Sequence, residues 1–384
     1  MTQAPRVPLA AADDLPCCGA DELVTVPVRL SEASYDIHVG LGTLGLLGTV
    51  YPPKRGSTGV VISSSTVARL YAEACLKALR EAGWRVQLLT VPDGEQSKTL
   101  AQAATLYEAC AQAGLDRGST IFALGGGVIG DLSGFVAATY MRGIPFVQVP
   151  TTLLAQVDAS VGGKTAVDLP VGKNLVGAFH QPSLVMIDVQ TLTTLSQRDL
   201  CAGMAEVIKH AMIADSEMFD YLGAAAEQLL RRELIPLRQM VARNCQIKAE
   251  VVEADPLEQG IRGWLNYGHT VGHALEVAAG EWDLRHGEAV AWGMLAEARL
   301  AVRLGLAAEG MATSLERLLR SYALATELPP VDAARARSSI IHDKKIVNGT
   351  LRLPLVPRIG ECVIRQDVPV ETVVEVMQEL LAGH

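Results

Sequence analysis

The sequence of 384 residues predicts a two-part fold, an α/β part with a parallel sheet followed by a mostly α-helical part. Strand-like and helix-like segments alternate through the first half, which is the order expected of βαβ units. After about Ser183 the pattern changes to long amphipathic stretches rich in Ala and Leu. We expect a loose N-terminal extension over residues 1–20, the α/β domain over 21–183 and the helical domain over 184–384.

The elements follow from the spacing of apolar residues along the chain. Short apolar segments bounded by turn residues predict strands at 36–40, 58–64, 85–91 and 119–125. Amphipathic segments predict helices at 68–83 and 98–114 in the first part, and at 229–254 and 289–305 in the second part.

Charge and composition argue against several classes of partner. The formal net charge is −9 without a basic block, so nucleic acid and anionic membranes are poor partners. No apolar run reaches the roughly 18 residues of a membrane span, and residues 1–30 lack the pattern of a secretory signal. The seven cysteines form neither a disulfide framework nor a CxxC zinc pattern. We therefore expect reduced thiols in a cytoplasmic protein.

A glycine cluster follows the strand predicted at 119–125. Glycines 125–127 lead into a helical pattern near Val128, which places bare backbone N–H groups at a helix N-terminus, a geometry that suits a pyrophosphate. A tight turn with close helix packing explains the cluster equally well, because the spacing is not GxGxxG. The later sequence around Lys164 is not a P-loop, since Asp158 stands where that motif needs glycine.

Two further segments place charged residues in apolar or glycine-rich surroundings. Lys164, Lys173 and Asn174 lie among glycines, which suits the binding of an anion, although a solvated surface loop is the alternative. Glu206 and Lys209 stand three residues apart in an otherwise apolar helix. They form either a surface ion pair or a buried pair, and a buried carboxylate needs a cation or a metal.

The segment LNYGHTVGHALE, residues 265–276, places histidines beside glycines. Read as one helix, it puts Asn266, His269 and His273 on one face, while Gly268 and Gly272 leave another face bare. The core of a helical domain does not require such a polar face. We expect it to meet a ligand or a metal.

Three separated segments offer zinc-type ligands, namely Glu206, His269 with or without His273, and His286. Three protein ligands with an open fourth position describe a catalytic zinc site. The HExxH motif of zinc proteases is absent. The pattern alone does not choose among the three histidines, any of which could instead be a hydrogen-bonded core residue.

Six segments resemble, in order and spacing, 3-dehydroquinate synthase, a family of sugar phosphate cyclases. They are LGGGVIGDLSGFVAATYMRG, VPTTLLAQVDASVGGKTAVDLPVGKNLVGAFHQP, GMAEVIKHAMI, LNYGHTVGHALE, RHGEAVAWGM and DKK. The resemblance implies an N-terminal NAD-binding α/β domain and a mostly α-helical C-terminal domain that holds a divalent metal, zinc or cobalt. It also implies a homodimer whose substrate is 3-deoxy-D-arabino-heptulosonate 7-phosphate, a sugar acid phosphate.

The resemblance also implies roles for individual residues. It matches the metal ligands to Glu206, His269 and His286. It matches the phosphate binders to Lys164, Asn174, His273 and Lys345, and an arginine given by the neighbouring subunit to Arg142. Groups that bind the carboxylate and hydroxyls are matched by Asp158, Lys209, Lys248, Arg262 and Asn266. The NAD site is matched by Asp93, Gly94, Glu95, Gln96, Ser97, Lys98, Gly127, Val128, Ile129, Gly130, Asp131, Thr151, Thr152, Lys164, Lys173, Thr191, Leu192, Thr193 and Thr194.

The implied reaction begins with oxidation of a ring alcohol by NAD, which acidifies the neighbouring C–H and lets phosphate leave. NADH then returns the hydride, and the product closes to a carbocycle by aldol addition. Sibling cyclases that act on an amino analogue or on neutral sugar phosphates are the alternative. A metal-dependent polyol dehydrogenase and a non-catalytic zinc-binding scaffold are further alternatives. The carboxylate-binding set Lys248, Arg262, Asn266 and His273 favours an acidic substrate over a neutral one.

Overall fold

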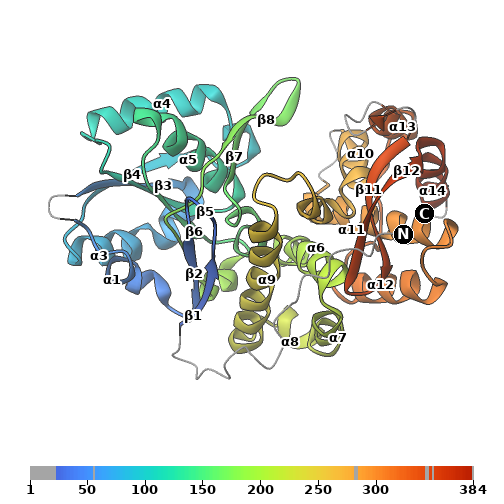
Figure 1. The fold of residues 1–384 in the computed structure, drawn as a ribbon. Coiled ribbons are helices and arrows are strands. Elements are labelled where there is room, and N and C mark those ends of the chain that lie inside the picture. Colours follow the sequence, from blue (N-terminus) through green and yellow to red (C-terminus); the bar gives the residue numbers. More distant parts are fainter. Residues whose placement is uncertain (1–22, 55–56, 281–283, 342–345, 348–349, 383–384) are drawn as a thin grey trace. The chain divides into compact units, whose positions relative to one another are not determined.

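The computed structural model describes residues 23–54, 57–280, 284–341, 346–347 and 350–382 (Figure 1). These residues fall into two compact units. The sheet unit contains described residues up to Leu195 together with Leu234–Glu253, and the helical unit contains Ser196–Glu233 and the described residues from Ala254 onward. The expected boundary after residue 183 therefore lies inside the sheet unit, because the next segment forms a central strand.

A seven-stranded sheet forms the centre of the sheet unit (Figure 1). Six neighbouring strands run parallel, and β1 is an antiparallel edge strand. In spatial order the strands are β1 (Val24–Val28), β2 (Tyr35–Gly40), β9 (Leu184–Asp188), β6 (Phe146–Pro150), β5 (Thr120–Gly125), β3 (Thr58–Ser64) and β4 (Arg85–Val91). The four strands expected from the sequence are all present, so the parallel-sheet prediction is confirmed.

Helices cover both faces of this sheet because the strand side chains alternate between two cores. Val60 and Ile62 pack with α4 and α5 on one face, whereas Val61 packs with α1 and α3 on the other. The helices of the sheet unit are α1 (Leu47–Val50), α2 (Ser65–Val67), α3 (Glu73–Glu81), α4 (Leu100–Gln112), α5 (Gly127–Thr139) and α9 (Leu234–Ala254), the last of which ends one residue beyond the unit.

Shorter elements complete the unit. An antiparallel hairpin of β7 (Lys164–Leu169) and β8 (Gly172–Phe179) contacts α5 and α4. Short helical turns of 3-10 or π type occur at Thr43–Leu46, Ala68–Ala72, Glu95–Ser97, Tyr140–Arg142, Ala155–Ala159 and Val189–Thr194.

The direction of strand addition reverses between β3 and β5. From β3 the chain adds β4 on one side, whereas β5 and β6 are added on the other side. Open parallel sheets bind ligands beyond the carboxyl ends of the strands at such a switch point. Glycines 125–127 stand there, at the end of β5 and the start of α5.

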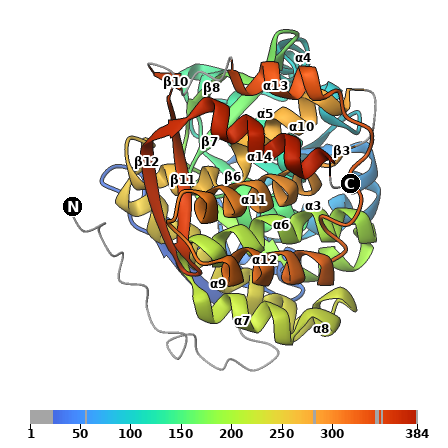
Figure 2. The same cartoon turned by 90° about the vertical axis from the view of Figure 1, so that its right-hand side faces the viewer.

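The helical unit is organised around α11, which contacts α6, α10, α12, α14 and β11 (Figure 2). Its helices are α6 (Gln197–Ala214), α7 (Ser216–Ala224), α8 (Ala226–Leu230), α10 (His269–Ala279), α11 (His286–Arg303), α12 (Glu309–Ser321), α13 (Ala333–Ile341) and α14 (Val370–Ala382). A small antiparallel sheet of β10 (Ile346–Val347), β11 (Thr350–Arg358) and β12 (Glu361–Pro369) was not predicted.

The histidine-rich segment is not one helix, which corrects the expectation for residues 265–276. A 3-10 helix covers Ile261–Asn266, and α10 begins only at His269. Gly268 separates the two with a φ of 80°, a left-handed conformation that ends a right-handed helix. Asn266 therefore does not share a helix face with His269 and His273.

The glycine face of the same segment packs against α11. A Cβ on Gly272 would stand 3.1 Å from the carbonyl oxygen of Ala289, and a Cβ on Gly293 would overlap the carbonyl oxygen of Gly268. The glycines beside the histidines thus allow two helix backbones to approach closely. Within the described residues, no helix is both long and apolar enough to cross a membrane.

Candidate functional site

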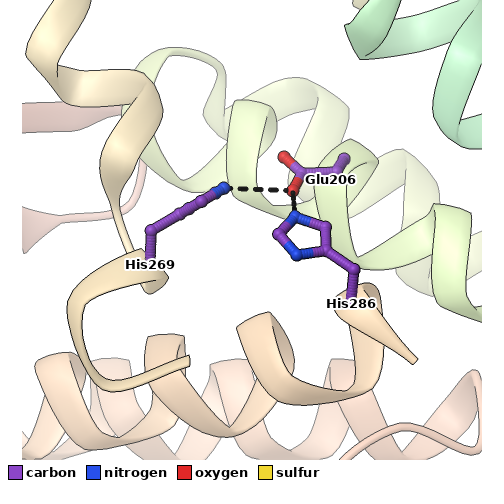
Figure 3. A group of neighbouring side chains, drawn as sticks. All are labelled: Glu206, His269 and His286. Atoms are coloured by element: carbon purple, nitrogen blue, oxygen red, sulfur yellow. Dashed lines mark ion pairs between the residues drawn. The ribbon is translucent and has the colours of Figure 1, made fainter. Parts of the chain in front are cut away.

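Three side chains from three helices of the helical unit point toward one another (Figure 3). Glu206 lies in the middle of α6, whereas His269 and His286 are the first residues of α10 and α11. The Oε1 atom of Glu206 is 3.5 Å from Nε2 of His269 and 3.4 Å from Nε2 of His286. The three potential ligand atoms lie within 4.8 Å of one another. One carboxylate oxygen and two imidazole nitrogens suit zinc or a similar divalent metal.

Hydrogen bonds fix the far side of each imidazole ring. The Nδ1 of His269 lies 3.1 Å from the carbonyl oxygen of Tyr267, and the Nδ1 of His286 lies 3.4 Å from Oε2 of Glu276. Both partners are acceptors, so each Nδ1 carries the hydrogen and each Nε2 is left to bind a cation. This second layer of contacts is the usual arrangement around a metal-binding histidine.

The group is buried and its charges are close together. Glu206 is fully buried and forms an ion pair with Lys209, whose side chain is 1% exposed. The surface alternative for this pair is thereby excluded. Lys209 is an ammonium beside the carboxylate that would hold the metal.

The two histidines differ in their tendency to take up a proton. Burial lowers the pKa of His269 well below its usual value, although the charge of Glu206 opposes this. Burial also disfavours the charged form of His286, but hydrogen bonds and charges from Glu206 and Glu276 outweigh it and raise the pKa to about 10. A cation at Nε2 would take the place of that proton, because a histidine ligand must be neutral.

His273 lies beside the group, one turn after His269 on α10. Its ring centroid is 5.3 Å from that of His269 and 5.8 Å from that of His286. Its side chain is 57% exposed, and Nε2 lies 3.9 Å from Oε2 of Glu276. The sequence pattern left open which histidines converge on Glu206. The geometry brings His269 and His286 to it and leaves His273 on the exposed side.

Glu276 is not among the site residues expected from the sequence. It stands seven residues after His269 and three after His273, so the helical spacing places it on the face of α10 that carries the histidines. That spacing was the signal that could have identified it.

The expected NAD-binding residues all belong to the sheet unit and cluster in its loops. The loop after β4 carries Asp93–Lys98, the start of α5 carries Gly127–Asp131, Thr151 and Thr152 follow β6, and Thr191–Thr194 follow β9. Because β4, β5, β6 and β9 are parallel, these loops share the carboxyl edge of the sheet. Lys164 and Lys173 lie on the hairpin and are exposed.

A buried ammonium ties three of these segments together. The Nζ of Lys98 lies 2.6 Å from Oδ2 of Asp131 and 2.5 Å from Oδ1 of Asn174. The backbone of the hairpin is fixed as well, since the N–H of Asp168 donates to the carbonyl of Lys98 at 2.7 Å. Burial raises the pKa of Asp131 to about 6, and the positive charge of Lys98 opposes the shift.

This shift predicts that Asp131 makes folding depend on pH. The folded state favours the protonated carboxyl, so stability from this group is present below about pH 4 and is lost as the pH rises through about 6. As the pH rises from 4 to 7, the unfolding free energy of Asp131→Asn should increase relative to that of wild type by up to about 3 kcal/mol. A pH-independent cost is superimposed on this change, because the variant leaves the buried Lys98 without its carboxylate partner. Urea unfolding of both proteins at pH 4, 5, 6 and 7 measures it. A difference that does not change with pH would contradict the prediction.

The other expected substrate-binding residues are divided between the two units. In the sheet unit, Nζ of Lys248 on α9 lies 2.6 Å from Oδ1 of Asp158. Arg142 is exposed at the end of the turn after α5, with a φ of 68°. In the helical unit, Arg262 is buried and Asn266 donates to Oε1 of Glu258 at 2.9 Å. Lys345 lies outside the described residues.

The fold resembles that of sugar phosphate cyclases of known structure. A structure of 2-deoxy-scyllo-inosose synthase complexed with carbaglucose-6-phosphate, NAD+ and Co2+ aligns with a TM-score of 0.85 and 27% identity, covering 93% of this chain and 100% of that chain. A 2-epi-5-epi-valiolone synthase from Streptomyces hygroscopicus subsp. jinggangensis 5008, with NAD+ and Zn2+ bound, aligns with a TM-score of 0.84 and 28% identity over 93% and 99% of the two chains.

Sequence comparison identifies the family. Residues 88–202 match the 3-dehydroquinate synthase N-terminal family, and residues 203–346 match the 3-dehydroquinate synthase C-terminal family. A 3-dehydroquinate synthase from Symbiobacterium thermophilum is 51% identical over 346 residues, which are 89% of this chain and 96% of that protein. The chain belongs to the 3-dehydroquinate synthase family. Glycerol dehydrogenase structures, at 15–16% identity, share the fold alone.

Proposed function

We propose that the chain is a 3-dehydroquinate synthase that converts 3-deoxy-D-arabino-heptulosonate 7-phosphate to 3-dehydroquinate and phosphate. The observation that carries the proposal is the convergence of Glu206, His269 and His286, in a chain 51% identical to a protein of that activity. A non-catalytic scaffold would be expected to use four protein ligands, as structural zinc sites usually do, whereas three ligands are typical of a catalytic site. When bound, NAD would take up and return a hydride, and a zinc or cobalt ion would polarise the substrate oxygens.

The residues of the helical unit would hold the metal and the acidic end of the substrate. Glu206, His269 and His286 supply the ligands, and Glu276 and the Tyr267 carbonyl keep the imidazole rings in the ligating tautomer. Lys209, Arg262 and Asn266, together with Lys248 and Asp158 of the sheet unit, are assigned to the carboxylate and hydroxyls of the substrate. Lysine and arginine are suited to a carboxylate because they stay charged at neutral pH.

The loops at the carboxyl edge of the sheet are assigned to NAD. The N-terminus of α5, at glycines 125–127, offers free backbone N–H groups to a pyrophosphate. Lys98 is held by Asp131 and Asn174, so it fixes the glycine-rich turn and the hairpin relative to each other within the sheet unit. Five cysteines of the described chain are free thiols, which supports a reducing, cytoplasmic setting.

Released phosphate and accumulated NADH distinguish this function from that of a polyol dehydrogenase. The purified protein, with a trace of NAD, a divalent metal and the heptulosonate phosphate, should release phosphate through many turnovers without a steady rise in NADH absorbance. Mass spectrometry should identify 3-dehydroquinate. NADH accumulating in proportion to product would instead indicate a dehydrogenase.

A sibling cyclase activity is the second candidate, since the two solved cyclase structures have nearly the same fold. Phosphate release measured in parallel with the amino analogue of the acid and with neutral sugar phosphates tests it. The lysine and arginine assigned to the carboxylate favour the acidic substrate. A higher kcat/KM for a neutral sugar phosphate would move the assignment to that activity.

Lys345 is proposed to bind the substrate phosphate together with Lys164, Asn174 and His273. A charge-assisted hydrogen bond contributes about 1.5–3 kcal/mol, so Lys345→Ala should lower kcat/KM by about ten- to a hundredfold. If the phosphate itself removes the C–H proton, kcat should fall as well, because these groups hold the phosphate against the carbon. The neighbouring Lys344→Ala is the matched control. If the kcat and kcat/KM of Lys345→Ala stayed as close to wild type as those of Lys344→Ala, Lys345 would not be part of the phosphate site.

Arg142 is proposed to act in the neighbouring subunit of a homodimer. Arg142→Ala and Glu206→Gln should each be inactive alone. Co-expressed in equal amounts, they should regain about a quarter of wild-type activity, because each mixed dimer holds one site with both native residues. Light scattering of the purified protein checks the dimer. If the mixed sample stays inactive although mixed dimers form, Arg142 acts within its own subunit.

A further inference from the structure

Glu297 is a fully buried carboxylate on α11 that the expected site does not use. A charged or polar group in such a place is costly unless hydrogen bonds compensate it. Its Oε2 accepts the backbone N–H of Gly268 at 2.7 Å. Gly268 immediately precedes His269, the first residue of α10 and one of the three residues that converge on Glu206.

The turn that contains Gly268 decides where the His269 ring points. The Nδ1 of His269 lies 3.1 Å from the carbonyl oxygen of Tyr267, so the orientation of the ring depends on the peptide between Tyr267 and Gly268. That same peptide carries the N–H that Glu297 accepts. The carboxylate and the imidazole thus bind the two ends of one peptide group.

Contacts from α11 hold this turn at three points. The hydroxyl of Tyr267 donates to the carbonyl oxygen of Met294 at 3.1 Å, and Gly293 allows the carbonyl oxygen of Gly268 to lie against the helix. Glu297 is the third point and the only one of the three that depends on a polar side chain of α11.

The charge of Glu297 also suits its position. Gly268 is the N-cap of α10, and its lack of a side chain means that it cannot cap the helix itself. The N-terminus of a helix carries a partial positive charge, which a nearby carboxylate stabilises. Glu297 therefore favours the start of α10 at His269, where Gly268 adopts a left-handed φ of 80°.

We propose that Glu297 is a positioning residue for the metal centre, which orients the His269 imidazole through the peptide between Tyr267 and Gly268. The proposal rests on the proposed function, since it assigns His269 as a metal ligand. Glu297 is not one of the three residues that converge to form the proposed metal centre. Its effect is transmitted by one hydrogen bond on each side of a peptide group.

Three variants separate positioning from general stability. Glu297→Met removes the acceptor at similar volume, and Glu297→Gln keeps an oxygen that can accept the same N–H. Leu300→Ala is the matched control, because Leu300 is 1% exposed on the same helix and its loss leaves a cavity without removing the hydrogen bond. The metal is stripped with a chelator, and Co2+ is titrated back while its visible absorption spectrum is recorded. Thermal unfolding of the metal-free proteins is measured alongside.

Glu297→Met should raise the Kd for Co2+ about tenfold or more and change the absorption spectrum, as losses around a histidine ligand do. Glu297→Gln should keep the wild-type spectrum and a Kd within about threefold. Leu300→Ala should lower the unfolding temperature while its Kd stays near wild type.

Three outcomes would overturn the proposal. The first is a Glu297→Met variant that binds Co2+ with the wild-type Kd and spectrum. The second is a Glu297→Gln variant that weakens binding as much as Glu297→Met does. The third is a Leu300→Ala variant that weakens binding as much as Glu297→Met does. Failure of the wild type itself to bind Co2+ would instead overturn the proposed function, and this inference with it.

Discussion

Glu206→Gln is expected to lose the metal and the enzymatic activity together. The amide is neutral and binds a divalent cation far more weakly than a carboxylate does, and the metal contributes several kcal/mol of charge stabilisation. Turnover should therefore fall by about a thousandfold or more. Metal content per chain and phosphate release measure the two effects. Glu217→Gln, an exposed carboxylate on α7, is the control.

The same substitution is expected to destabilise the helical unit, because it leaves the buried ammonium of Lys209 without its carboxylate partner. Breaking one side of a buried ion pair costs about 3–5 kcal/mol. The double variant Glu206→Gln with Lys209→Met should regain most of that stability but no metal. One full metal equivalent in Glu206→Gln would refute the assignment of this carboxylate.

Gly287→Ala is expected to damage both the fold and the metal centre. Gly287 follows His286 on α11, and a Cβ there would overlap the carbonyl oxygen of Ala202, one turn before Glu206 on α6. Backbone atoms cannot move aside as a flexible side chain can, so α11 must shift away from α6 and carry His286 with it. Such overpacking costs about 1–3 kcal/mol or more.

Metal affinity and unfolding temperature measure this effect. An unfolding temperature lower by about 5–10 °C and a clear loss of metal affinity are expected. Gly310→Ala on α12 is the matched control, because among the described residues no atom outside its own helix and chain neighbours lies within 4 Å of a Cβ at this position. It should be neutral or slightly stabilising, since alanine favours a helix more than glycine does. If Gly287→Ala behaved like this control, the close contact between the two helices would not exist in solution.

The sequence predicted the parts of the fold that depend on local patterns. The alternating strands and helices of the sheet unit, such as β3 (Thr58–Ser64) and α4 (Leu100–Gln112), occur where periodicity placed them. Their apolar spacing reports which faces are buried, and that is a property of the local chain. The candidates Glu206, His269, His273 and His286 also stand out in the sequence, because they are polar residues among apolar or glycine-rich neighbours. That local pattern does not show which of the three histidines converge on Glu206.

Features that depend on distant partners were not predicted. The break at Gly268 needs the backbone of α11 against it, and no local pattern reveals that contact. β9 was placed outside the α/β part because its five residues precede a helical stretch, whereas its pairing with β2 and β6 defines its unit. The sequence does not single out Glu297, since its partner is a backbone N–H 29 positions earlier.

The placement of α9 constrains how the protein can be made and divided. Residues 234–253 of this helix belong to the sheet unit, although the preceding and following segments belong to the helical unit. Three contacts hold it there, since Lys248 pairs with Asp158, Cys245 donates to the carbonyl of Gln156, and Glu253 accepts the N–H of Arg29. During synthesis on the ribosome, the sheet unit cannot complete its packing until this helix has emerged. A fragment that stops at Leu195 would therefore be an unfinished unit, and a stable excised version would need α9 supplied through an artificial linker.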